Sequence, residues 1–187
     1  MKNQNANLIV NTKKLVITSM FTALTTVATI AVQIPMAFGY VNLGDMFVLL
    51  SAFVLGTWYG VAAAGIGSAM ADVIIGYAIY APGTFIIKAI MSLIVSLIIK
   101  SLNGKIRLTI LLQLIAGIVA EIIMVLGYFF YEAVILGYSW AAVSSVVGNL
   151  IQGGVGVALA ITVFSVFNNR KIFFTTNSDA KKEKENE

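Results

Sequence analysis

Long apolar runs limit what this sequence can fold into more than any other feature. Leu15–Ile34, Gly83–Ile99, Leu108–Tyr131 and Trp140–Phe167 each approach or exceed the length of about 20 apolar residues that a helix needs to cross a bilayer. A fifth apolar region, Met46–Ile79, is longer still. Only 11% of the residues are charged, against about 25% in a soluble domain. The sequence therefore predicts an all-α integral membrane protein that forms one compact unit.

The number of crossings follows from the basic residues. The pair Gly56 and Gly60 favours a break within Met46–Ile79, which makes two helices of that region. Basic loops remain in the cytoplasm, and an even number of crossings must separate one cytoplasmic loop from the next. We therefore predict six transmembrane helices with both termini cytoplasmic; a re-entrant Met46–Ile79 is the alternative. The basic clusters are Lys13 and Lys14; Lys100, Lys105 and Arg107; Arg170 and Lys171.

Three segments follow from this topology. Residues 1–14 form a cytoplasmic N-terminal segment, residues 15–167 form the six-helix domain, and residues 168–187 form a charged, disordered cytoplasmic tail. Pro35 is expected to end the first helix. The outer loops are then Pro35–Asp45, Gly76–Pro82 and Glu132–Ser139.

Ionisable residues occur inside the apolar region, although a charge at the bilayer centre costs about 2.5–3.5 kcal/mol. A rise of about 1.5 Å per residue places all of them in the outer half or at the outer rim, with Asp45 at the outer start of its helix. Polar residues also recur every three or four positions along four helices, so each helix presents one polar face. These patterns predict an internal polar pocket that opens to the outside. The ionisable residues are Asp45, Asp72, Lys88, Glu121 and Glu132.

Two hypotheses explain Asp72 and Lys88. They form a purely structural ion pair between adjacent antiparallel helices, or Lys88 contacts a ligand and Asp72 is its buried support. Lys88 shares a face with Thr84 and Ser92, whereas Asp72 lies on a face of small residues that leaves little room for a ligand. We favour the second hypothesis.

Several chemistries are excluded by composition. The chain has no cysteine and no histidine, which removes thiol chemistry, histidine-based triads and the commonest transition-metal ligands. The neighbourhood of Lys105 lacks the first glycine and the Ser/Thr of a Walker A loop. We predict no metal site, no cofactor and no ATPase activity. An intramembrane aspartyl enzyme that uses Asp45 and Asp72, or a small channel, remains as an alternative class.

An ordered set of motifs resembles a known family. It consists of Asn42-Leu43-Gly44-Asp45, Gly56…Gly60, Gly65-Ile66-Gly67-Ser68…Asp72, Gly76-Tyr77, and Tyr80-Ala81-Pro82-Gly83-Thr84…Lys88. Together they are similar to the substrate-binding S component of an energy-coupling factor (ECF) vitamin transporter, over residues 15–167.

The resemblance implies a six-helix subunit of the bacterial plasma membrane that binds a vitamin from outside under the loops after helices 1 and 3. Its partners would be a membrane scaffold (T) component and two cytoplasmic ATPases. In the family, small residues four apart on helix 1 face the scaffold; Ser19 and Ala23 match that pattern loosely, with Val27 interrupting it.

The pattern resembles most closely the branch for riboflavin, hydroxymethylpyrimidine or pyridoxine. A small pyrimidine or pyridine is preferred, because aromatic residues are dense around the expected pocket, and riboflavin is the alternative. Tyr77, Tyr80 and Trp140 are expected to stack on the ring. The remaining expected substrate contacts are Lys88, Thr84, Asn42, Glu121, Asn149 and Gln152, with Asp72 and Asp45 as structural support.

Overall fold

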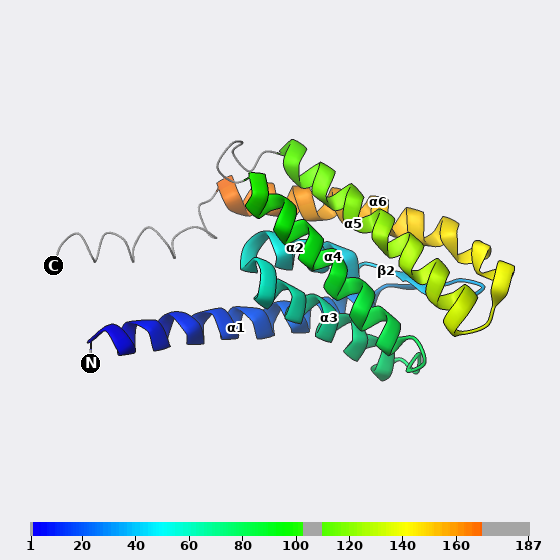
Figure 1. The fold of residues 1–187 in the computed structure, drawn as a ribbon, viewed down its shortest axis with the longest axis horizontal. Coiled ribbons are helices and arrows are strands. Elements are labelled where there is room, and N and C mark those ends of the chain that lie inside the picture. Colours follow the sequence, from blue (N-terminus) through cyan, green and yellow to red (C-terminus); the bar gives the residue numbers. More distant parts are fainter. Residues whose placement is uncertain (1, 103–109, 170–187) are drawn as a thin grey trace.

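The computed structural model describes residues 2–102 and 110–169, and this part of the chain is a helical bundle with one short hairpin (Figure 1). Its elements in chain order are α1 (Lys2–Ala31), β1 (Gln33–Pro35), β2 (Tyr40–Asn42), α2 (Gly44–Leu55), α3 (Thr57–Ile74), α4 (Ala81–Leu102), α5 (Ile110–Phe130), the π-helical turn η1 (Tyr131–Ile135), the 3-10 turn η2 (Ser139–Ala142) and α6 (Val143–Asn169). The all-α prediction is confirmed.

Four segments of the described chain are long and apolar enough to cross a membrane: Thr12–Ala31, Ala81–Leu102, Ile110–Ile135 and Ser139–Phe167. At about 1.5 Å per residue, the 12-residue helix α2 is only about 18 Å long, too short for a hydrocarbon core of about 30 Å. Residues 2–102 and 110–169 contain six α-helices, but the count of six membrane crossings stays a prediction.

The start of α1 and the ends of α4 and α6 lie at one end of the bundle, at the left of Figure 1. Lys13, Lys14 and Lys100 belong to that end. This arrangement favours the predicted orientation, which itself stays a prediction. The remaining basic residues of the three clusters, and the charged tail from residue 170 onward, lie outside the described residues.

Gly56 separates α2 from α3, as the glycine pair predicts. Its backbone has φ 72° and ψ −159°, a conformation that is open almost only to glycine. The chain reverses there, and a β-carbon at Gly60 would lie 2.9 Å from the carbonyl oxygen of Ser51. The break thus lets α2 and α3 pack closely, and the prediction of two helices in this region is confirmed.

The segment after α1 differs from the expected loop. Helix α1 ends at Ala31, before Pro35, and the chain then forms an antiparallel hairpin that pairs Gln33 with Asn42 and Pro35 with Tyr40. Proline disfavours the helical conformation in the residue that precedes it, so the helix stops early and extended backbone follows. Gly39, with φ 68°, makes the turn.

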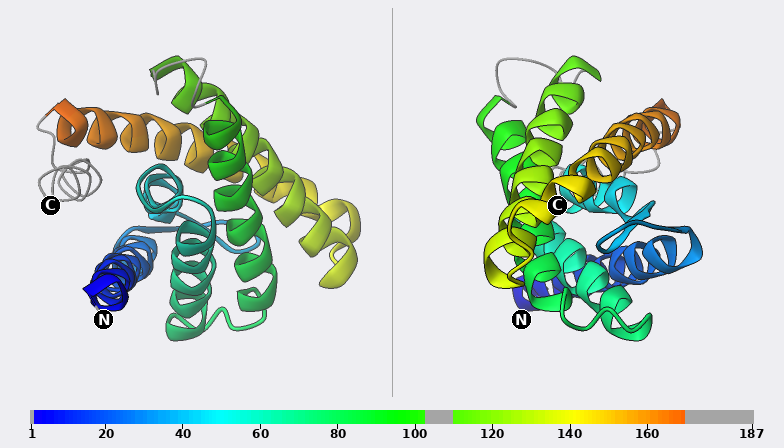
Figure 2. Two further views of the ribbon diagram at one scale, coloured as in Figure 1. Left: turned by 60° about the vertical axis from the view of Figure 1, so that its left-hand side comes forward. Right: turned by 90° about the vertical axis from the view of Figure 1, so that its right-hand side faces the viewer.

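The hairpin returns the chain to the interior, where α2 begins. Helix α2 contacts α1, α3, α4 and α6, which surround it in Figure 2. Asp45 in its first turn is consequently 0% exposed. Asp45 thus lies inside the bundle, and its expected depth at the outer edge of the membrane stays a prediction.

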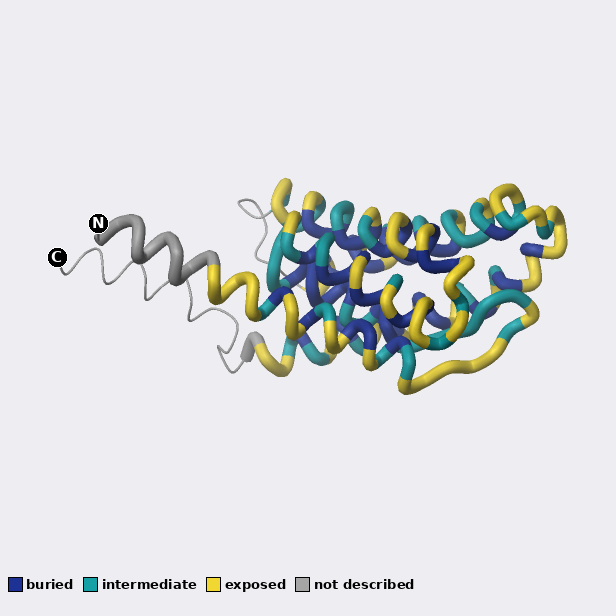
Figure 3. The backbone as a smooth tube through the Cα atoms, turned by 90° about the horizontal axis from the view of Figure 1, so that it is seen from below, coloured by how far each residue is buried: buried dark blue, intermediate teal, exposed yellow. Residues whose placement is uncertain are grey.

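Buried and exposed residues are separated as in a bundle that is surrounded by lipid. Buried residues face the centre of the bundle, and exposed residues cover the outward helix faces (Figure 3). Many exposed side chains are large and apolar, including Ile122, Leu126 and Ile151. Such surfaces are typical of helices that face hydrocarbon rather than water.

Candidate functional site

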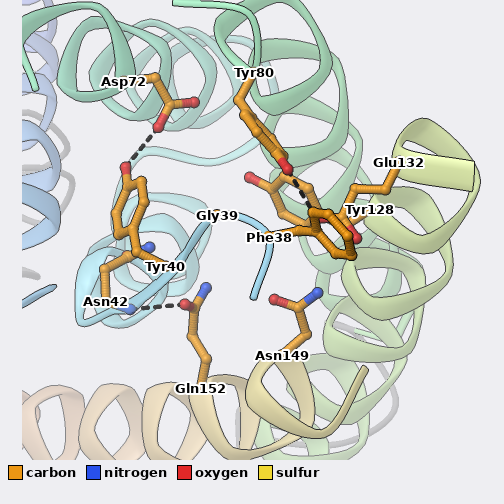
Figure 4. A pocket seen from close by; sticks show the side chains of 10 residues that line it. All are labelled: Phe38, Gly39, Tyr40, Asn42, Asp72, Tyr80, Tyr128, Glu132, Asn149 and Gln152. Atoms are coloured by element: carbon orange, nitrogen blue, oxygen red, sulfur yellow. Dashed lines mark hydrogen bonds between the residues drawn. The ribbon is translucent and has the colours of Figure 1, made fainter. Parts of the chain in front are cut away.

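A pocket lies beneath the hairpin, and residues from five parts of the chain line it (Figure 4). Its empty space, including the open mouth, is about 340 Å³. The lining residues are Phe38, Gly39, Tyr40 and Asn42 from the hairpin, Asp72 from α3, Tyr80 from the α3–α4 connection, Tyr128 and Glu132 from α5 and η1, and Asn149 and Gln152 from α6. Aromatic rings and polar groups therefore line the same cavity.

The amide of Gln152 joins the hairpin to the interior. Its Oε1 accepts a hydrogen bond from the backbone N of Asn42 at 2.8 Å, and its Nε2 donates to Oδ2 of Asp45 at 2.6 Å. Asn42 in turn accepts the backbone N–H of Gly44 at 2.8 Å. Both the oxygen and the nitrogen of the Gln152 amide are thus hydrogen-bonded. The bond to the Asp45 carboxylate requires the nitrogen to face Asp45, so it fixes the orientation of the amide in the pocket wall.

Lys88 forms a buried ion pair with Asp45, and the two side chains are 3% and 1% exposed. The ammonium also lies 5.4 Å from the centre of the Tyr128 ring. The expectation that Asp72 is the partner of Lys88 is therefore wrong. The hairpin places the start of α2 inside the bundle, and Asp45 therefore lies next to Lys88. Lys88 lies beneath the pocket lining in this structure, so a direct contact with a ligand stays a prediction.

Asp72 is bonded to the hairpin instead. The Tyr40 hydroxyl donates to its Oδ1 at 2.5 Å. Burial, and secondarily the Asp72 carboxylate, raise the pKa of Tyr40 above its ordinary value, so this hydroxyl keeps its proton and remains the donor. Asp45 and Asp72 thus have separate partners, which gives no support to a shared aspartyl dyad.

Glu132 is the second acid of the pocket wall. It accepts hydrogen bonds from the Tyr80 hydroxyl at 3.4 Å and from the Ser145 hydroxyl. Burial and the adjacent Glu132 raise the pKa of Tyr80, which keeps that hydroxyl protonated. The third tyrosine, Tyr128, donates to Oγ1 of Thr84 at 3.0 Å.

The predicted substrate contacts divide into four groups. Asn42, Tyr80, Asn149 and Gln152 line the pocket. Tyr77 lies next to the pocket, with its ring 5.1 Å from that of Tyr40 and 6.0 Å from that of Tyr80. Thr84 and Lys88 are buried behind the lining, and the structure does not bring Glu121 and Trp140 to the cavity.

Glu121 and Trp140 lie elsewhere for different reasons. Glu121 faces α6, where a β-carbon at Gly153 would lie 3.0 Å from its Oε2, and neither of its carboxylate oxygens has a hydrogen-bond partner among the described residues. Trp140 in η2 is 82% exposed. Its position suits a membrane interface, and the structure does not support stacking of this ring on a ligand.

Six lining residues were absent from the predicted substrate contacts: Phe38, Gly39, Tyr40, Tyr128 and Glu132, together with Asp72, which was predicted as structural support. The spacing of Glu121, Tyr128 and Glu132, seven and then four residues apart, is a helical signal that places all three on one face. The hairpin residues carried no comparable signal, because a loop has no periodicity to indicate which side chains turn inward.

Ser19 and Ala23 lie on the exposed outer face of α1, beside Met20 and Leu24. The Ser19 hydroxyl bonds back to the carbonyl of Leu15 at 3.0 Å. The opposite face of the helix is buried and includes Thr25. Both predicted docking residues are thus accessible from outside the bundle, as docking requires, although their role is untested.

Comparison with known proteins identifies a family and a relative. A protein-family model described as "ECF-type riboflavin transporter, S component" matches residues 9–168. An uncharacterized protein of Pyrococcus woesei is 36% identical over 143 residues, which cover 72% of this chain and 93% of that protein. The region matched by the family model includes most of α1 and every later element up to α6.

Proposed function

Because the chain belongs to the family of S components of ECF-type riboflavin transporters, we propose that it captures a hydroxylated, planar heteroaromatic vitamin in the pocket under the hairpin. Membership makes the chain a membrane-bound, substrate-binding subunit of a vitamin transporter and not an enzyme. The vitamin, the contacts and the direction of capture are the proposal.

The observation that carries the proposal is the composition of the pocket wall. Phe38, Tyr40, Tyr80 and Tyr128 offer aromatic faces, and Asn42, Asn149 and Gln152 offer amide donors and acceptors. Aromatic rings bind a flat ring by stacking, and a few placed polar groups fix its orientation.

Riboflavin is the first candidate, because the matching family model is named for it. A smaller ring, such as hydroxymethylpyrimidine or pyridoxine, is the second. The aromatic side chains of Phe38, Tyr80 and Tyr128 crowd the pocket wall, which favours a small ring.

The same proposal includes partners and orientation. The outer face of α1, with Ser19 and Ala23, docks on a membrane scaffold component that also holds two cytoplasmic ATPases. Six crossings of the plasma membrane place both termini in the cytoplasm and the hairpin outside.

Two measurements test the function. Mass spectrometry of small molecules released from the purified protein identifies the vitamin, and titration with riboflavin, hydroxymethylpyrimidine and pyridoxine ranks the candidates. In liposomes, the chain alone should bind the labelled vitamin without accumulating it when ATP is present. Concentrative, ATP-dependent uptake by this chain alone would refute the assignment as a binding subunit.

A further inference from the structure

One carboxylate oxygen in the pocket wall has no hydrogen-bond donor. Asp72 is 3% exposed and lines the pocket. Tyr40 donates to its Oδ1 at 2.5 Å, while Oδ2 has no hydrogen-bond partner among the described residues. Figure 4 shows this second oxygen turned toward the space between Tyr40 and Tyr80. A buried acceptor that faces a cavity without a donor is costly unless something else supplies one.

The neighbouring hydroxyl groups do not supply that donor. The Thr84 hydroxyl lies close enough to Asp72 to stabilise its carboxylate, but it forms no hydrogen bond with Oδ2 by geometry and it accepts the Tyr128 hydroxyl. Tyr80 donates to Glu132. A donor group on a molecule that enters the pocket would satisfy Oδ2.

The charge of the pocket points to the same kind of ligand. Its wall contains two carboxylic acids, Asp72 and Glu132, and no lysine or arginine among its lining residues as described. The adjacent ammonium of Lys88 is already paired with Asp45. An anionic group in this buried site would meet like charge in a medium that screens poorly, whereas an N–H, O–H or cationic group would be stabilised.

We propose that Asp72 is a substrate-contacting residue that determines specificity: its Oδ2 accepts an N–H or O–H of the vitamin, and the site rejects the phosphorylated form of the same vitamin. This inference rests on the proposed function and deepens it. It also changes the expected role of Asp72 from structural support to ligand contact.

The test compares free vitamins with their phosphate esters on the purified full chain. Riboflavin with riboflavin 5′-phosphate, and pyridoxine with pyridoxine 5′-phosphate, are titrated against the wild type and Asp72→Asn. Asparagine keeps an oxygen for Tyr40 but replaces Oδ2 by an amide donor. Ser68→Ala is the matched control, because Ser68 is buried one turn away on α3 and does not line the pocket, and its hydroxyl has no hydrogen-bond partner in the part of the chain that the structure describes.

The wild type should bind the free vitamin at least about tenfold more tightly than its ester. Asp72→Asn should weaken binding of the free vitamin by roughly 10- to 150-fold, the usual effect of losing a hydrogen bond to a charged group. It should also reduce the discrimination against the ester, and Ser68→Ala should change neither quantity.

The two levels of the proposal fail differently. If the wild type binds none of these vitamins, the proposed function is refuted and this inference with it. If the wild type binds a vitamin and Asp72→Asn keeps its affinity and its discrimination, only the role of Asp72 is refuted. Should Asp72→Asn not fold, the wild-type preference decides, and equal affinity for vitamin and ester overturns the inference.

Discussion

Removing the charge of Lys88 tests the ion pair beneath the pocket. In Lys88→Met, the carboxylate of Asp45 stays buried at 1% exposure and keeps only the amide of Gln152. Breaking a buried pair by removing one partner costs about 3–5 kcal/mol. At about 2–4 °C per kcal/mol for a chain of this size, the melting temperature should fall by roughly 6–20 °C.

A second change identifies which acid is the partner. The double variant Asp45→Asn with Lys88→Met removes both charges and should recover most of the lost stability. Asp72→Asn with Lys88→Met is the control, and it should remain as unstable as Lys88→Met because Asp72 is bonded to Tyr40. Thermal unfolding in detergent, followed by circular dichroism, measures all four proteins.

Vitamin affinity gives the other half of this test. Lys88 does not line the pocket, so the Asp45→Asn, Lys88→Met protein should still bind the vitamin within about tenfold of the wild type, a difference of about 1.4 kcal/mol. The reasoning is refuted if Lys88→Met is as stable as the wild type, or if Asp72→Asn restores stability equally well. Loss of binding in a folded Asp45→Asn, Lys88→Met protein would contradict this expectation and would show that Lys88, or the support that Asp45 gives to Gln152, is needed for ligand binding.

Three further changes test packing and docking. Ala23→Trp on the outer face of α1 should leave vitamin affinity unchanged and abolish transport with the partner module; lost affinity in a folded protein would contradict this. Gly67→Ala should destabilise the protein by about 1–3 kcal/mol, because the new β-carbon would lie 2.7 Å from the carbonyl oxygen of Thr22. Gly154→Ala is the control and should be neutral, because a β-carbon at Gly154 would have no neighbour within 4 Å. Glu121→Gln should melt no lower than the wild type, since it removes a buried acid whose oxygens lack partners among the described residues; a clear loss of stability would indicate an ionic partner.

The sequence by itself determined the helices and their inward faces. The lengths of the apolar runs predicted the positions of the long helices. The glycine pair predicted the break at Gly56, because glycine can adopt the backbone conformation found there. Helical periodicity also predicted that Asp72, Lys88 and Gln152 face the interior, and all three are buried. These features depend on residues close together in the chain, so local pattern was enough to predict them.

The tertiary structure decided which inward groups meet. Asp45 and Asp72 both face the interior, and no local pattern shows which of them Lys88 reaches. That choice depends on the hairpin after α1, which places the start of α2 beside Lys88 and directs Tyr40 to Asp72. The two pairs join residues that are 32 and 43 positions apart in the chain. Which residues pair at such separations depends on how the helices and the hairpin pack, and not on local sequence pattern. For that reason the sequence indicated a polar pocket, but only the fold showed that Asp72 and Glu132 lie in its wall.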